Sequence, residues 1–195
     1  MWDSGPLSVT PHKIAPLASV DYPKTCTAMR SFLGGLKAIA KCIPKYSTLL
    51  SPLEDATKGL NGADQIAWCD ELRASFKKAQ TALVDVKTLT IPRPSDMLVI
   101  TVDASPVNMG IGATLYVIRD GRRSVAEYFS LKLKSHQLGW LPCELEALAI
   151  GTAVTHFSSY IREATTPVQI LTDSKPCVQA CQKLCKGHFS TSSRV

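Results

Sequence analysis

The sequence predicts a mixed α/β fold, in which three antiparallel strands are followed by a helix, a strand and a helix, with a small helical region ahead of them. Three observations predict it. Leu98–Ser105 is a short apolar, β-branched run between polar and Pro residues, which is typical of a buried strand. An Asp-Gly turn at residues 119–122 joins two further apolar runs into a meander. The N-terminal part carries apolar residues at three- and four-residue steps, as helices do.

In the N-terminal part, residues 1–23 contain four Pro residues and little periodicity, which predicts an extended or loop-rich segment. Gly34-Gly35 lies inside the first predicted helix and has two interpretations, a close backbone approach or a break. The helices are expected at residues 25–41, at 46–58 and from about residue 70 onward.

A stiff linker, Ile91–Pro94, follows these helices, and its Pro residues continue neither a helix nor a strand. We therefore expect two parts, a helical region at residues 1–94 and a sheet domain at residues 95–195. In the sheet domain, strands are expected at 98–105, 108–118 and 124–130, then a helix from 141 to about 162, a strand at 168–173 and a helix from 174 to about 184. This order fits a mixed sheet with helices packed on its faces.

Composition sets broad limits on function. The formal net charge of +6 and the pI of about 9.0 permit a polyanionic partner without requiring one. Cys177, Cys181 and Cys185 lie four residues apart, which fits either a metal or redox cluster or small buried hydrophobic residues. Because no signal peptide and no membrane-spanning apolar run is visible, we expect an intracellular protein, cytoplasmic or nuclear, without membrane contact.

Two predicted strands end in a carboxylate, one at Asp103 and the other at Asp173. If these strands are neighbours, both carboxylates lie at the same edge of the sheet. On the helix between them, Glu146 falls on the side facing the sheet, whereas Glu144 is expected in the solvated first turn. An inward Glu beside two carboxylates is costly unless a cation balances the charge, and oxygen ligands suit Mg²⁺ or Mn²⁺. The alternative is that these are scattered surface acids.

Three sets of segments carry a family resemblance: Val102–Ser105 with Gly110–Leu115, Cys143–Ile150 with His156–Ile161, and Leu171–Pro176. They resemble the ribonuclease H domain in the pol polyprotein of LTR retrotransposons, most closely the BEL/Pao-like group. The segments that resemble the thumb and connection region downstream of the polymerase palm are Met29–Gly34, Ile43–Ser47, Ser51–Leu53 and Ile66–Trp68.

The resemblance implies a ribonuclease H-like fold in which Asp103, Glu146 and Asp173 stand on the metal-binding, catalytic acids of the family. It also implies Mg²⁺- or Mn²⁺-dependent hydrolysis of the RNA strand of RNA–DNA hybrids. The reaction would be part of a reverse transcriptase, within a polyprotein that also holds a polymerase palm and an integrase.

Two departures from the family pattern bear on activity. The Tyr-x-Asp-Asp polymerase motif is absent, and the family's fourth acid is expected beyond Val195, so the domain is interpreted as truncated. A catalytically inactive remnant, at most a nucleic-acid-binding or structural module, is therefore the alternative.

Five further residues are candidates for nucleic-acid contacts. Lys132, Lys134 and Lys175 are expected near the carboxylate edge, where they could meet phosphates, although plain solvation explains them equally well. Ser105 and Asn108 follow the first acid and could reach a 2′-hydroxyl, although turn chemistry also accounts for them.

Overall fold

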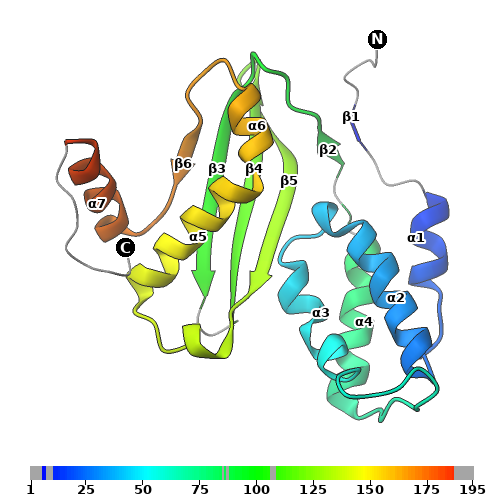
Figure 1. Cartoon of the computed structure of the whole chain (residues 1–195). Helices are drawn as coiled ribbons and strands as arrows, with labels where there is room; N and C mark the ends of the chain where they lie inside the picture. The colour runs from blue at the N-terminus through cyan, green and yellow to red at the C-terminus, as the bar shows by residue number, and fades with distance from the viewer. Residues whose placement is uncertain (1–5, 8–10, 85, 87, 106–108, 187–195) are drawn as a thin grey trace.

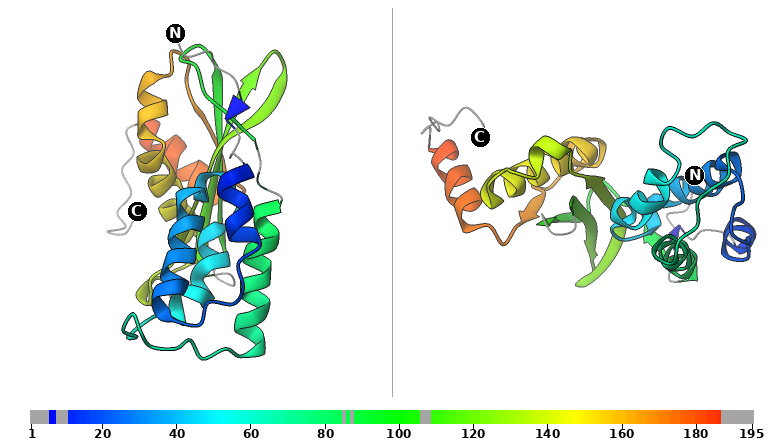
Figure 2. Two further views of the ribbon diagram at one scale, coloured as in Figure 1. Left: turned by 90° about the vertical axis from the view of Figure 1, so that its right-hand side faces the viewer. Right: turned by 90° about the horizontal axis from the view of Figure 1, so that it is seen from below.

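The structure is a computed structural model that describes residues 6–7, 11–84, 86, 88–105 and 109–186. An N-terminal group of helices lies beside a sheet that carries helices of its own (Figure 1). The view from below shows the same two parts next to each other, and in the view from the side the N-terminal helices lie in front of the sheet (Figure 2). The predicted mixed α/β fold is confirmed. No finding tests the boundary at residue 94, which stays a prediction.

The helical region is held together by one apolar core. Its elements are α1 (Pro11–Ala18), α2 (Cys26–Ala38), the 3₁₀ helix η1 (Ala40–Cys42), α3 (Tyr46–Asp55) and α4 (Asp70–Val84). Met29, Leu53 and Phe76 are completely buried where the apolar stripes of α2, α3 and α4 meet. Thr25 caps α2 by accepting a hydrogen bond from the Ala28 N–H. The helices predicted in this region are confirmed, with ends shifted by a few residues.

Helix α1 corrects one prediction, because an extended or loop-rich segment was expected at residues 1–23. Ile14 and Leu17 of α1 pack against the core of the helical region. A Cβ added to Gly35 of α2 would lie 2.7 Å from Leu17 Cδ2, so glycine permits the close approach of the two helices. Helix α2 continues through Gly34-Gly35 without a break. The burial that stabilises α1 comes from residues distant in sequence, which a local pattern does not contain.

The sheet domain is built on four strands within the described residues, in the order β5-β4-β3-β6. Their bounds are β3 Met97–Ser105, β4 Gly110–Arg119, β5 Arg122–Lys132 and β6 Gln169–Leu171. Strands β3, β4 and β5 form the predicted antiparallel meander, and β6 pairs with β3 in parallel. Asp120 and Gly121 have φ angles of 52° and 72°, which this tight Asp-Gly hairpin requires. A separate small pairing joins β1 (Pro6–Leu7) to β2 (Leu89–Thr90).

One helix covers the face of the sheet that forms its core. The remaining elements are η2 (Ser135–Gln137), α5 (Pro142–His156), α6 (Ser158–Glu163) and α7 (Lys175–Cys185). Leu145 and Ala149 of α5 pack over Ile100 of β3, and all three are almost completely buried. Helix α5 lies across the sheet in front of β3 (Figure 1). The single helix predicted up to about residue 162 is divided at the buried Phe157 into α5 and α6. None of the described helices has the length and apolar character needed to span a membrane.

A buried carboxylate links the two parts along β5. Glu127 is 2% exposed, and its Oε2 accepts hydrogen bonds from Lys41 Nζ of the helical region at 3.2 Å and from the Tyr160 hydroxyl at 3.1 Å. Its Oε1 lies 2.7 Å from Nε2 of His156, whose ring stacks on Phe129. A buried charge with this many partners is satisfied, so it holds β5, α5, α6 and η1 in one arrangement.

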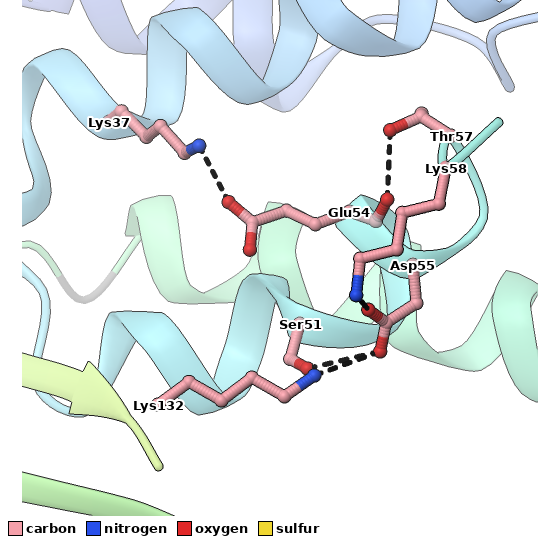
Figure 3. A network of polar contacts seen from close by, with 7 residues as sticks. All are labelled: Lys37, Ser51, Glu54, Asp55, Thr57, Lys58 and Lys132. Carbon is pink, nitrogen blue, oxygen red and sulfur yellow. Dashed lines mark hydrogen bonds and ion pairs between the residues drawn. The ribbon is translucent and has the colours of Figure 1, made fainter. Parts of the chain in front are cut away.

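A second polar contact closes the same junction near the end of β5 (Figure 3). Lys132 Nζ lies 3.0 Å from Asp55 Oδ2 at the end of α3, and Lys58 Nζ lies 2.6 Å from the other oxygen of Asp55. Hydrogen bonds from Lys58 and Lys132 hold the pKa of Asp55 below its usual value. Helix α3 is therefore tied to β5 by charge as well as by packing.

We predict that Ile100→Ala lowers the free energy of unfolding by about 2–5 kcal/mol, because this completely buried side chain leaves a cavity in the middle of the sheet. Urea unfolding followed by circular dichroism measures the loss. Ile170 of β6 is a matched control, since it is the strand partner of Ile100 of β3 but is 37% exposed. Ile170→Ala should cost distinctly less, and equal losses for the two variants would contradict the packing described here.

Candidate active site

The candidate site lies where two neighbouring parallel strands end. Thr101 of β3 is paired with Leu171 of β6, and each is followed two residues later by an Asp. Asp103 and Asp173 are therefore at the same edge of the sheet, and both are exposed. The carboxyl end of β3 and the first turns of α5 lie at the same end of the domain (Figure 1).

Glu146 reaches this edge from α5 and is half-buried. Burial raises the pKa of its carboxyl, and the negative charge of Asp173, and to a lesser extent that of Asp103, raises the pKa further. Hydrogen bonds from the Ala104 backbone N–H and from the Thr172 hydroxyl, which lies 3.5 Å from Glu146 Oε2, oppose this shift. Asp103 and Asp173 thus both lie within electrostatic range of Glu146.

Glu144 has a different environment from Glu146, as the sequence led us to expect. Its Oε2 accepts a hydrogen bond from the Leu141 backbone N–H at 2.9 Å. A carboxylate in this position satisfies one of the free N–H groups at the start of α5. Glu144 therefore helps to begin the helix, whereas the carboxyl of Glu146 is affected by the charges of Asp173 and Asp103.

The three carboxylates offer the oxygen ligands that a divalent metal prefers, but their side chains are not close enough together to share one ion. Their oxygens are the donors that Mg²⁺ and Mn²⁺ prefer, and the raised pKa of Glu146 is a cost that a bound cation would relieve. In the part of the chain that the structure describes, no three His, Cys, Asp or Glu side chains are close enough to hold an ion.

Asp103 instead contacts an ammonium group. Lys45 Nζ, from the helical region, lies 3.1 Å from Asp103 Oδ2. A pocket of about 180 Å³ lies beside this pair, lined in part by Thr101, Thr114 and Tyr128. Because Ile100 and Val102 pack into the core under α5, alternation along β3 puts Thr101 and Asp103 on the opposite face of the sheet.

The predicted nucleic-acid contacts have different surroundings. Lys132 is bound to Asp55, and therefore reaches towards the helical region. Lys134 and Lys175 are exposed, the latter at the first position of α7. Ser105 ends β3 opposite Gly110, whereas Asn108 lies outside the described residues. All five contacts stay predictions.

Two ion pairs were not foreseen from the sequence, that of Lys45 with Asp103 and that of Glu127 with Lys41. Lys45 meets Asp103 across 58 positions of the chain, and Glu127 lies 86 positions from Lys41. The local signal at Glu127 was a charged residue between the apolar pairs Val125-Ala126 and Tyr128-Phe129 of β5, which calls for buried partners. No local signal marked Lys45.

Among the side chains that the structure describes, which do not include that of Cys185, the cysteines of α7 form no metal cluster. Cys177 is buried with its Sγ 3.4 Å from the Cys143 carbonyl oxygen, and Cys181 is exposed. Cys177 therefore fits the interpretation as a small buried hydrophobic residue.

Comparison with known proteins defines the family. The family model described as "RNase H-like domain found in reverse transcriptase" matches residues 68–170. Because this match covers more than half of the 195 residues, the chain belongs to that family. The predicted resemblance to the ribonuclease H-like part of a retroelement polyprotein is confirmed. The finer assignment to the BEL/Pao-like group stays a prediction.

Curated relatives come from fission yeast retrotransposons. The chain is 28% identical over 162 residues to the Transposon Tf2-3 polyprotein of Schizosaccharomyces pombe, and the Tf2-4 polyprotein matches equally well. Each match covers 78% of this chain and 11% of the relative, so the chain spans about a tenth of the length of these polyproteins.

Solved structures support the fold. The foamy viral protease-reverse transcriptase dRH in complex with ds DNA matches 95% of this chain and 31% of its own, with a TM-score of 0.75 and 19% identity. The foamy viral protease-reverse transcriptase in complex with RNA/DNA hybrid matches 95% of this chain and 24% of its own, with a TM-score of 0.73 and 18% identity. Since both alignments cover nearly the whole chain, they include the helical region as well as the sheet domain.

We predict that Glu146→Gln makes the metal-free protein more stable than wild type at pH 7 but not at about pH 4. The folded protein raises the pKa of Glu146 above its ordinary value of 4.5, so folding favours the protonated form. The stability that comes from protonated Glu146 is fully present below the pKa of this residue in the unfolded chain. It is lost as the pH rises through the pKa of Glu146 in the folded protein. Glutamine stays neutral throughout.

Thermal unfolding of both proteins in EDTA between pH 4 and pH 7 measures the effect. Glu144→Gln is the control, and it should give no gain at pH 7 because its carboxylate accepts the Leu141 N–H. A Glu146→Gln protein less stable than wild type at pH 7 would contradict the carboxylate cluster.

Proposed function

We propose that this chain is the ribonuclease H-like part of a retroelement reverse transcriptase and hydrolyses the RNA strand of RNA–DNA hybrids. The observation that carries the proposal is that Asp103 and Asp173 lie at one edge of the sheet, where their charges act on the Glu146 carboxyl. Membership of the RNase H-like family of reverse transcriptases supports it. A solved foamy viral relative in fold is a complex with RNA/DNA hybrid, which supports the same substrate.

In this proposal Asp103, Glu146 and Asp173 hold Mg²⁺ or Mn²⁺. The bound metal would activate a water for attack on a phosphodiester and stabilise the leaving oxygen. The chain itself supplies positioning: β3 and β6 carry the two Asp residues on paired strands, while Thr172 and Ala104 orient the Glu146 carboxylate. The raised pKa of Glu146 means that the metal-free cluster holds a proton more readily than an isolated Glu.

The nucleic-acid partner would be bound by groups around this edge. Lys134 and Lys175 are exposed cations that could pair with phosphates, and Ser105 lies at the end of β3 beside Asp103. Lys132 would contribute if the strand displaced it from Asp55. The rest of a pol polyprotein, including a polymerase palm and an integrase, and an intracellular setting belong to the same proposal.

The second candidate is a nucleic-acid-binding module without catalysis. Two observations favour it: within the described residues no three acidic, His or Cys side chains are spaced to hold an ion, and Lys45 already neutralises Asp103. In this case the sheet domain would bind the duplex without cutting it.

Cleavage of an RNA–DNA hybrid labelled on the RNA strand, with Mg²⁺ and with EDTA, separates the two functions. We predict Mg²⁺-dependent cleavage that falls by at least about 100-fold in Asp103→Asn, because removing even an indirect support of a metal costs 10- to 100-fold. Glu144→Gln is the matched control on the same helix and should keep its activity, since Glu144 caps α5. Hybrid binding with no cleavage above the Asp103→Asn level would reject the enzyme and favour the binding module.

A further inference from the structure

We propose that Lys45 is a phosphate-binding residue of this site, which holds a phosphodiester of the bound strand beside Asp103. The inference rests on the proposed function, because it takes a nucleic acid as the ligand of this edge. It adds a residue from the helical region to a site otherwise made by the sheet domain.

The backbone of Lys45 gives its side chain a defined origin. Lys45 follows Pro44 and directly precedes α3, with a φ of 50° in the left-handed region. At the same turn, the Ser47 backbone N–H donates to Ser130 Oγ of β5 at 2.8 Å. This contact fixes the start of α3 against the sheet, so the long Lys45 side chain starts from a fixed point and ends at Asp103.

The ion pair of Lys45 with Asp103 is exchangeable. Their side chains are 64% and 58% exposed, so solvent screens the attraction and competes with it. The neighbouring lysine of the junction, Lys41, is different because its partner Glu127 is only 3% exposed in its side chain. Lys41 therefore stays paired with Glu127 at the junction, whereas Lys45 can leave Asp103 for another anion with little loss of free energy.

The surroundings of Lys45 suit a phosphate. Among the residues that line the adjoining 180 Å³ pocket, Asp103 is the acidic side chain, and Thr101, Thr114 and Tyr128 carry hydroxyl groups. Neutral hydroxyls can donate hydrogen bonds to phosphate oxygens without repelling them. A divalent cation on Asp103 would compete with the ammonium of Lys45 for the same carboxylate. The phosphate would then take the place of Asp103 as the partner of Lys45.

Binding of a fluorescent RNA–DNA hybrid to the full chain in EDTA, from 50 to 200 mM salt, tests the proposal. Lys45→Asn removes the charge with a residue that tolerates positive φ. Its slope of log K against log salt should be smaller than that of wild type by about one. Over this fourfold range of salt, wild type should therefore lose about 3.5-fold more affinity than the variant. Lys45→Arg keeps the charge and should keep the wild-type slope.

Lys58→Ala is the matched control. It also removes one exposed lysine charge from the helical region, but that charge is paired locally with Asp55. Its slope should equal that of wild type. If Lys45→Asn leaves the slope unchanged, or if Lys58→Ala lowers it equally, the assignment of Lys45 is overturned.

A double-mutant cycle with Asp103→Asn adds an independent readout. Freeing Lys45 from its carboxylate should raise metal-free affinity for the hybrid more in the wild-type background than in Lys45→Asn. Equal gains in both backgrounds would count against the proposal.

The two proposals fail separately. Hybrid binding with the expected Lys45 effect but without Mg²⁺-dependent cleavage overturns the enzyme and keeps the phosphate site. Mg²⁺-dependent cleavage with no effect of Lys45→Asn on the salt slope keeps the enzyme and overturns the phosphate site. A wild-type chain that binds no hybrid overturns both.

Discussion

The parallel pairing of β6 with β3 is the constraint on which the site depends. Two parallel neighbours cannot be joined by a hairpin, so the chain must cross over the sheet between them. Helices α5 and α6 make that crossing, and α5 is held there by the burial of Leu145 and Ala149. The same crossing puts Asp103 and Asp173 at one edge, with Glu146 at the start of the connecting helix. A hairpin in its place would separate the acids.

Bringing carboxylates together has an electrostatic cost that the chain offsets only in part. Burial and two neighbouring charges raise the pKa of Glu146, while hydrogen bonds from Ala104 and Thr172 act in the opposite direction. Lys45 neutralises Asp103 from outside the sheet domain. The exposed ion pair leaves Asp103 available for exchange.

Local patterns were sufficient for much of the fold, since each element there carries its own signal. The β-branched run of β3, the Asp-Gly hairpin and the apolar stripe of α4 are all visible in short windows of sequence. Helix α1 was missed because its stability comes from Gly35 and the core that it covers. The network around Glu127 was missed for the same reason, since its partners lie on η1, α5 and α6.

The sequence by itself determined the types and order of most strands and helices, the family, and which three acids are candidates for a shared site. Periodicity and motif spacing are local properties, so they can be recognised in the sequence without a structure. Only the tertiary structure decided that Asp103 pairs with Lys45, and that Glu144 accepts a hydrogen bond from the Leu141 N–H at the start of α5. Those outcomes depend on how helix and strand surfaces pack across the chain, where small rotations change which charges meet.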